Sequence, residues 1–119
     1  MCLIARHLEA NGLPTLCLGS AFDILSAGSP PRAMFVDYPL GHSAGKPFDH
    51  ADQEYIVESA LNGFNSLKKP GQIGIIHSDW GSVDWKNEAS STTGEDTRRP
   101  RDTTPQYQFE ADRVAAEKI

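Results

Sequence analysis

The sequence is short of cysteine, of long apolar runs and of basic residues, and each shortage excludes a class of protein. Its 119 residues include two cysteines, which are too few for a disulfide framework and favour a reducing, cytoplasmic compartment. No segment approaches the roughly 20 apolar residues of a membrane span, so we expect no membrane partner. The net charge of −5 argues against a nucleic-acid partner, which requires a basic surface.

Apolar residues are also nearly missing from one long segment, residues 86–106. It contains a single apolar side chain, Ala89, and equal numbers of positive and negative charges. Such a segment buries too little surface to offset the entropy lost on ordering. We therefore divide the chain into an α/β domain at 1–85, an extended or disordered polar arm at 86–106 and a short C-terminal helix at 107–119.

Within 1–85, three short apolar runs predict strands, at 15–18, 33–36 and 73–76. Helical patterns over 1–11, 21–27 and 49–67 separate them, with Ser20 and Asp49 as expected N-caps of the second and third helix. The alternation predicts an α/β fold, a small three-layer parallel sheet of about three strands with helical crossovers. Near-continuous apolar runs indicate strands covered on both faces, and Val57, Ala60, Leu61 and Phe64 mark the expected packed face of the longest helix. One sheet edge is expected to need another subunit or strand.

Ligands of open parallel sheets bind beyond the carboxyl ends of the strands, and polar residues gather there. We predict three catalytic residues, Asp37, His42 and His77, and three substrate-binding residues, Ser20, Ser43 and Lys46. Imidazole is suited to acid–base work near neutral pH, and a lysine ammonium can hold an anionic substrate. The alternative is that Asp37 caps a turn while His42 and Lys46 are simply solvated.

No metal or cofactor is assigned, because the sequence has no His-x-x-x-His or Cys-x-x-Cys pair and no tight cluster of ligands. Cys2 is a redox candidate, since a helix N-terminus favours the reactive thiolate. Cys17 falls inside a predicted strand, where a thiol acts as a small apolar residue. Trp80 and Trp85 flank a polar turn, and we expect them at a subunit contact.

Two segments resemble a known family. The first reads Leu3-Ile-Ala-Arg-His-Leu-Glu-Ala-Asn-Gly-Leu-Pro-Thr and resembles the helix-to-strand segment of the glycine/sarcosine/betaine reductase selenoprotein B family. The second reads Pro30-Pro-Arg-Ala-Met-Phe-Val-Asp-Tyr-Pro-Leu-Gly-His-Ser-Ala-Gly-Lys-Pro and is similar to a segment of small bacterial relatives of that family. The resemblance covers about residues 1–80. The family's redox loop precedes the helix that matches 1–11, so the resemblance does not give Cys2 the role of nucleophile.

Three functions follow as hypotheses. The first is a small subunit of a heteromeric reductase-like enzyme, in which a larger related subunit supplies the redox group and this chain adds strand-end loops to a shared active site. Its substrate would be a small molecule, expected to carry a carboxylate. The second is a self-sufficient homo-oligomeric enzyme with an interface site that uses histidine acid–base chemistry. The third is a non-catalytic structural or regulatory subunit.

Overall fold

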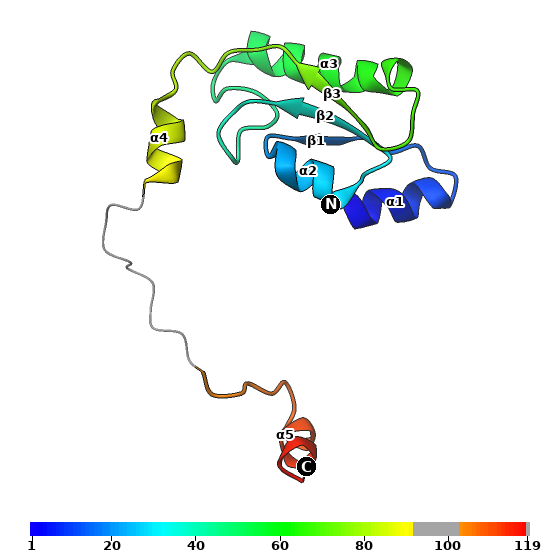
Figure 1. The fold of residues 1–119 in the computed structure, drawn as a ribbon, viewed down its shortest axis with the longest axis vertical. Helices are drawn as coiled ribbons and strands as arrows, with labels where there is room; N and C mark the ends of the chain where they lie inside the picture. Colours follow the sequence, from blue (N-terminus) through cyan, green and yellow to red (C-terminus); the bar gives the residue numbers. More distant parts are fainter. Residues whose placement is uncertain (92–102, 119) are drawn as a thin grey trace.

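A computed structural model describes residues 1–91 and 103–118 of the chain. Its centre is a three-stranded parallel sheet in the order β1-β2-β3 (Figure 1). The strands are β1 (Cys17–Gly19), β2 (Arg32–Val36) and β3 (Gln72–Ile76). Ala33 of β2 pairs with Cys17 on one side and with Ile73 on the other. The structure thus confirms the expected α/β fold with a small parallel sheet.

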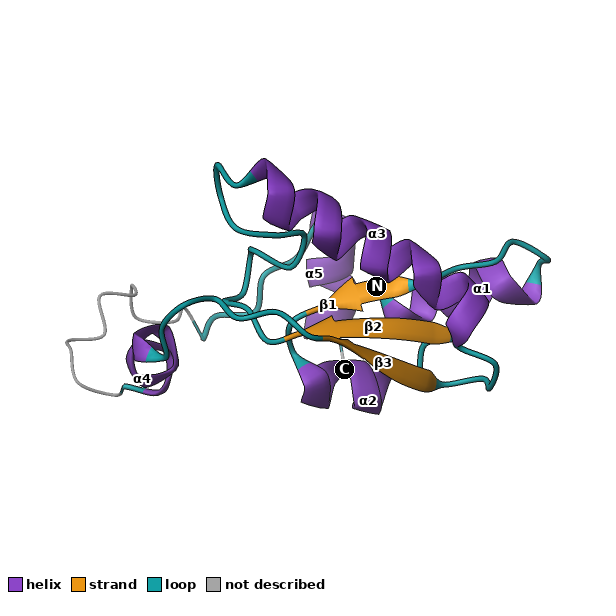
Figure 2. Ribbon diagram, turned by 90° about the horizontal axis from the view of Figure 1, so that it is seen from above, coloured by secondary structure: helices purple, strands orange, loops and turns teal. Residues whose placement is uncertain are grey.

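Helices cover both faces of this sheet. One face carries α3, and the other carries α1 and α2, so the domain has three layers (Figure 2). Two further helices follow β3 in the chain. The helices are α1 (Cys2–Ala10), α2 (Phe22–Gly28), α3 (His50–Ser66), α4 (Asp84–Ser90) and α5 (Glu110–Glu117).

The two crossovers of the sheet have opposite hands. The chain passes from β1 through α2 to β2 and then through α3 to β3, always stepping in the same direction across the sheet. Leu25 of α2 packs on the face of Ala33, whereas Ile56 of α3 packs on the face of Met34. Two right-handed crossovers stepping in one direction would place both helices on the same face, so one crossover here is left-handed, against a strong general preference.

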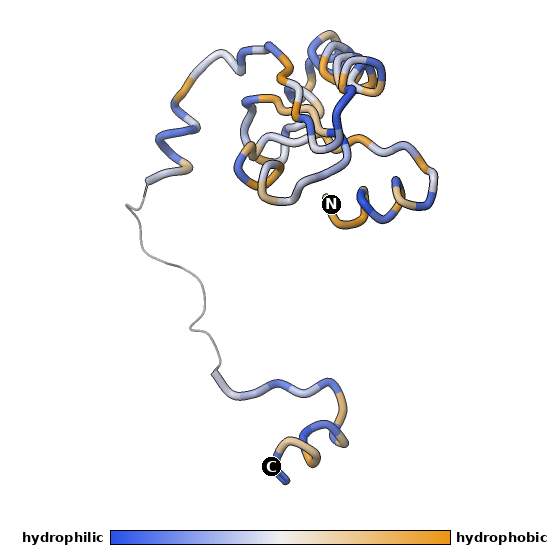
Figure 3. Tube along the Cα trace, turned by 45° about the vertical axis from the view of Figure 1, so that its right-hand side comes forward, coloured by the Kyte–Doolittle hydropathy of each residue, from blue (hydrophilic) through white to orange (hydrophobic). Residues whose placement is uncertain are grey.

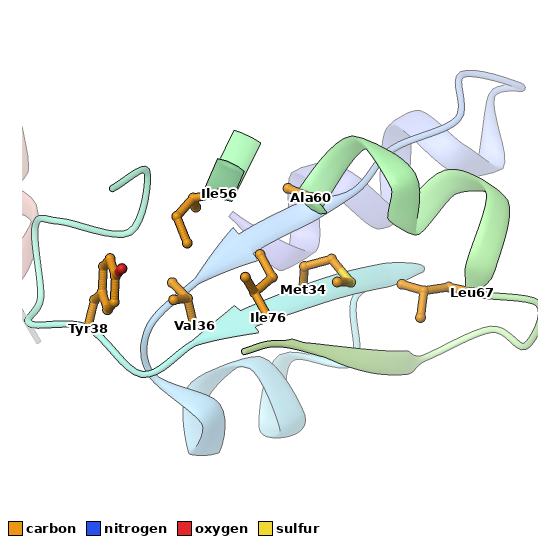
Figure 4. Close-up of a cluster of buried hydrophobic side chains, with 7 residues drawn as sticks. All are labelled: Met34, Val36, Tyr38, Ile56, Ala60, Leu67 and Ile76. Carbon is orange, nitrogen blue, oxygen red and sulfur yellow. The ribbon is translucent and has the colours of Figure 1, made fainter. Parts of the chain in front are cut away.

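The core beneath α3 is built from apolar side chains of β2, β3 and α3 (Figure 4). Its buried members are Met34, Val36, Tyr38, Ile56, Ala60, Leu67 and Ile76. Two glycines make room for Met34: a Cβ at Gly63 would lie 3.0 Å from its Cγ, and one at Gly74 would lie 2.5 Å from its Sδ. Close packing of this kind fixes the position of α3 on the sheet.

The packed face of α3 differs from the sequence prediction. Val57, Leu61 and Phe64 were expected in the core, but they are 44%, 59% and 39% exposed. Of the predicted set Ala60 alone is buried, and the buried side of the helix consists of Ile56, Ala60 and Gly63. Figure 3 shows hydrophobic and hydrophilic residues mixed along α3, which makes the choice of face ambiguous from the pattern. Each residue turns the helix by about 100°, so a shift of one position moves the packed stripe to the neighbouring side.

The opposite face of the sheet is only partly covered. Its buried cluster consists of Cys2, Ala5, Cys17, Leu25 and Ala33. The cluster is built on β1 and β2, and Ile73 is the residue of β3 that packs against it. Ile75 on the same side of β3 is 55% exposed. The expectation that every strand is covered on both faces was therefore wrong for β3.

The segment after β3 was expected to be an extended arm from residue 86 onward. Helix α4 instead crosses this boundary, and its Lys86 bonds to Asp37 in the long connection 37–49 after β2. Residues 92–102 of the predicted arm lie outside the described residues. The C-terminal helix is present as α5, with no buried residue. Among the described residues, none of the helices has the length and apolar character needed to span a bilayer.

Candidate functional site at the strand ends

The carboxyl ends of the three strands meet at one edge of the sheet, where hydroxyl groups join them. Ser20 follows β1, and its Oγ lies 3.2 Å from the Oγ of Ser43. Ser20 was expected to cap α2, but the N-cap is Ala21 and no side chain caps this helix. The Ser20–Ser43 contact instead holds the loop 37–49 against the end of β1.

Tyr38 joins the remaining two strand ends. Its side chain is completely buried directly after β2. The hydroxyl donates to Oδ1 of Asp52 at 2.7 Å and lies 2.6 Å from Oγ of Ser78, which follows β3. Tyr38 therefore connects the loop, the first turn of α3 and the end of β3 through a single phenol group.

Asp52 is the acceptor at the centre of this network. Its Oδ2 also accepts the Lys46 backbone N–H at 2.8 Å. Burial opposes ionisation of Asp52, but the hydrogen bonds from Lys46 and Tyr38 outweigh it and lower the pKa of the carboxyl. Burial, together with the nearby Asp52 charge, raises the pKa of Tyr38. The pair is thus a carboxylate held by a neutral phenol.

His42 and Lys46 lie on the outer side of this network. The His42 ring packs on Trp80 with centroids 5.3 Å apart, and Trp80 also meets Tyr38 edge-on at 5.2 Å. The Lys46 Nζ lies 5.9 Å from the centre of the Tyr38 ring. Within the described residues no carboxylate oxygen comes within ion-pair distance of this ammonium. Lys46 thus places an ammonium, whose charge also acts on the Asp52 carboxylate, beside a half-buried imidazole.

Asp37 lines a neighbouring cavity of about 220 Å³. Its Oδ2 lies 2.5 Å from Nζ of Lys86, and that ammonium stands 5.3 Å from the centre of the Trp85 ring. The cavity walls combine aromatic, hydroxyl and charged groups from Asp37, Ser78, Asp79, Trp80, Ser82, Val83, Trp85 and Lys86. Both tryptophans were expected at a subunit contact, but Trp80 packs within the chain, against the core and His42.

The structure brings some of the predicted site residues into contact and leaves others apart. Ser20 and Ser43 touch, and His42 and Lys46 flank Tyr38 and Trp80. His77 contributes mainly its backbone, since its carbonyl accepts the Tyr55 hydroxyl at 3.0 Å while its side chain is exposed. In residues 1–91 and 103–118, no hydrogen bond or ion pair joins the His77 ring to the other predicted residues.

Two residues of this site were not predicted from the sequence. Asp52 lies inside the predicted helix 49–67 and was given no role, although an acidic residue three positions after the cap Asp49 can accept from the preceding loop, as it does from the Lys46 N–H. Lys86 was assigned to the polar arm and carries no local signal of its partner, which is 49 positions earlier.

Cys2 does not belong to the strand-end site. It is buried with residues of α2 and β1 at the other end of the sheet, so its thiol lies away from the polar residues of the strand ends. Within the described parts of the chain, no three side chains of the metal-binding types cluster closely enough to hold an ion.

Comparison of the chain with protein-family models, with curated proteins and with solved structures finds no match. The fold and the arrangement of residues at the strand ends therefore define the molecule. It is a small parallel α/β domain whose strand-end loops are joined by a buried tyrosine, carry the Lys46 ammonium and border a small cavity.

Proposed function

We propose that the chain is a small subunit of a heteromeric reductase-like enzyme related to the glycine/betaine reductase family. Its strand-end loops contribute to a shared active site that acts on a small, carboxylate-bearing substrate. One observation carries this proposal: the ends of all three strands are joined into one polar surface, through Ser20–Ser43 and through Tyr38. A preformed surface of this kind sits where parallel sheets bind their ligands.

The residues of the surface have complementary roles in such a site. Lys46 supplies an ammonium for the substrate carboxylate, because among the described residues no carboxylate oxygen lies within ion-pair distance of it. His42 supplies a half-buried imidazole for proton transfer. Cys2 and Cys17 are both buried away from the site, so the redox group is proposed to come from the larger subunit.

The apolar surface of the domain supports a role within an assembly. Val57 and Leu61 of α3 are 44% and 59% exposed and lie among the polar residues Gln53, Glu54 and Glu58. Ile75 is exposed on the sheet face opposite α3, at an edge strand. We propose that these exposed apolar side chains contact the larger subunit in the assembly.

A homo-oligomeric enzyme is the second candidate, and the packing of His42 on Trp80 favours it. An imidazole held in a fixed orientation is suited to acid–base catalysis without help from another chain type. In that case the lone chain would be active, and His42→Ala would abolish the activity while Cys2→Ser would leave it unchanged.

The anion-binding role of Lys46 leads to a direct test. We expect two- to four-carbon carboxylates to shift the backbone NMR signals of the loop 37–49, with binding weakened about tenfold in Lys46→Met, the loss of about 1.4 kcal/mol of charge-assisted contact. Lys68→Met is the matched control, because Lys68 lies beyond the other end of α3. Equal affinities for Lys46→Met and the unmodified chain, or no shifts in the loop, would contradict the role given to Lys46.

A further inference from the structure

The two cysteines of the chain are neighbours in the fold, although 15 positions separate them in the sequence. Cys2 is the first residue of α1 and Cys17 is the first residue of β1. They are 9% and 2% exposed and are both members of one buried cluster. Two thiols brought together in this way are the starting point for a disulfide.

Gly28 at the end of α2 fixes the position of Cys2. A Cβ at Gly28 would lie 2.7 Å from the Cys2 Sγ and 2.8 Å from its Cβ, so the thiol occupies space that only glycine leaves open. The pair lies on the sheet face opposite α3. It is therefore independent of Tyr38, Asp52 and the other groups of the strand-end site.

We propose that Cys2 and Cys17 form a reversible intramolecular disulfide when the protein meets a peroxide. In the first step the Cys2 sulfur attacks one peroxide oxygen, which gives a sulfenic acid and releases water. In the second step the Cys17 sulfur attacks the Cys2 sulfur, the S–S bond forms, and the hydroxyl leaves with the Cys17 proton as a second water. Two electrons pass from the thiols to the peroxide.

The surroundings of the two thiols determine which one reacts first. Cys2 is the more exposed of the two thiols, at 9% against 2% for Cys17, so a peroxide meets Cys2 first. Burial raises the pKa of Cys17, and the neighbouring Cys2 raises it further. Cys17 therefore remains a thiol until the Cys2 sulfenic acid forms beside it.

The disulfide would join the start of α1 to β1 and close the loop that contains α1. Closing a loop of this length restricts the unfolded chain, which is expected to raise the melting temperature by roughly 10 °C. Hydrogen exchange of the α1 amides would slow for the same reason, because the helix could no longer detach from the sheet.

The test uses the full chain, treated with hydrogen peroxide and then with a thiol-alkylating reagent. We expect the intact mass to fall by about 2 Da, both cysteines to resist alkylation, and a peptide linking Cys2 to Cys17 that dithiothreitol separates. Cys17→Ala keeps a small apolar side chain in the core, and peroxide treatment of this variant should not lower its mass by about 2 Da. A chain that keeps two free thiols, forms disulfide-linked dimers, or gains about 32 Da as a sulfinic acid would overturn the proposal. If Cys17→Ala does not fold, the mass change and the linked peptide of the unmodified chain still test the proposed disulfide.

Discussion

Replacing Asp52 by alanine is expected to lower the free energy of unfolding by about 2 kcal/mol, since the lost hydrogen bonds involve a charged acceptor that is partly open to solvent. Asp52 accepts from the Tyr38 hydroxyl and from the Lys46 amide, so the variant releases two segments of the loop 37–49 at once. Urea unfolding followed by tryptophan fluorescence measures the change, because Trp80 packs directly on Tyr38.

Asp49→Ala is the matched control for this variant. Asp49 is the N-cap of α3, and its side chain accepts the Asp52 backbone N–H. Asp49→Ala is expected to lower the free energy of unfolding by about 1 kcal/mol without disturbing Tyr38. Similar losses in the two variants, with an unchanged environment of Trp80 in Asp52→Ala, would show that Asp52 acts as a helix-start residue and not as the centre of the network.

The same carboxyl predicts a dependence of stability on pH. The folded chain lowers the pKa of Asp52, so its contribution is fully present above the pKa of the unfolded chain and is lost as the pH falls through the folded value. Below about pH 4 the unmodified protein should therefore lose more stability than Asp52→Asn. Parallel pH profiles for the two proteins would contradict this role of the ionised carboxylate.

Gly45→Ala is expected to lower the free energy of unfolding by about 3 kcal/mol or more. We expect no other single added methyl group in the loop to cause a larger loss. Gly45 is buried with a φ of +120°, and a Cβ there would lie 2.7 Å from the Cα of Gln53 in α3. The added methyl would meet backbone, which cannot turn aside as a side chain could. The loop would have to lift from α3 and would carry Lys46 with it.

Gly41→Ala separates the backbone strain of a positive φ from the steric clash with α3. Gly41 also has a positive φ, of +92°, but no atom lies within 4 Å of the position its Cβ would take. Only the backbone strain remains, so we expect a loss of about 1 kcal/mol. Unfolding curves of the two variants should differ clearly, and equal losses would show that Gly45 does not pack closely against α3.

The sheet and its order of elements could be predicted because they depend on local patterns. The apolar runs at 33–36 and 73–76 mark β2 and β3 almost residue by residue, and Asp49 caps α3 as predicted. Ser20 and Ser43, both chosen as strand-end residues, lie in contact, since parallel strands end at one edge of a sheet.

The features that were missed depend on tertiary packing. The packed face of α3 includes Gly63, which leaves space for the side chains of Leu16 and Met34, and hydrophobic spacing does not reveal such a contact. The opposite placement of α2 and α3 breaks the usual rule of crossover handedness. The pairing of Asp37 with Lys86 joins two segments that no local motif relates.

We propose that the strand-end surface completes an active site together with a larger subunit. Native mass spectrometry tests it most directly, on the chain co-expressed with the products of the reading frames beside its own. We expect a heteromer of fixed stoichiometry with a larger reductase-like chain, and a lower yield of that heteromer for Gly45→Ala than for Gly41→Ala. A chain that stays monomeric beside all of those products, or that assembles only with itself, would contradict the claim.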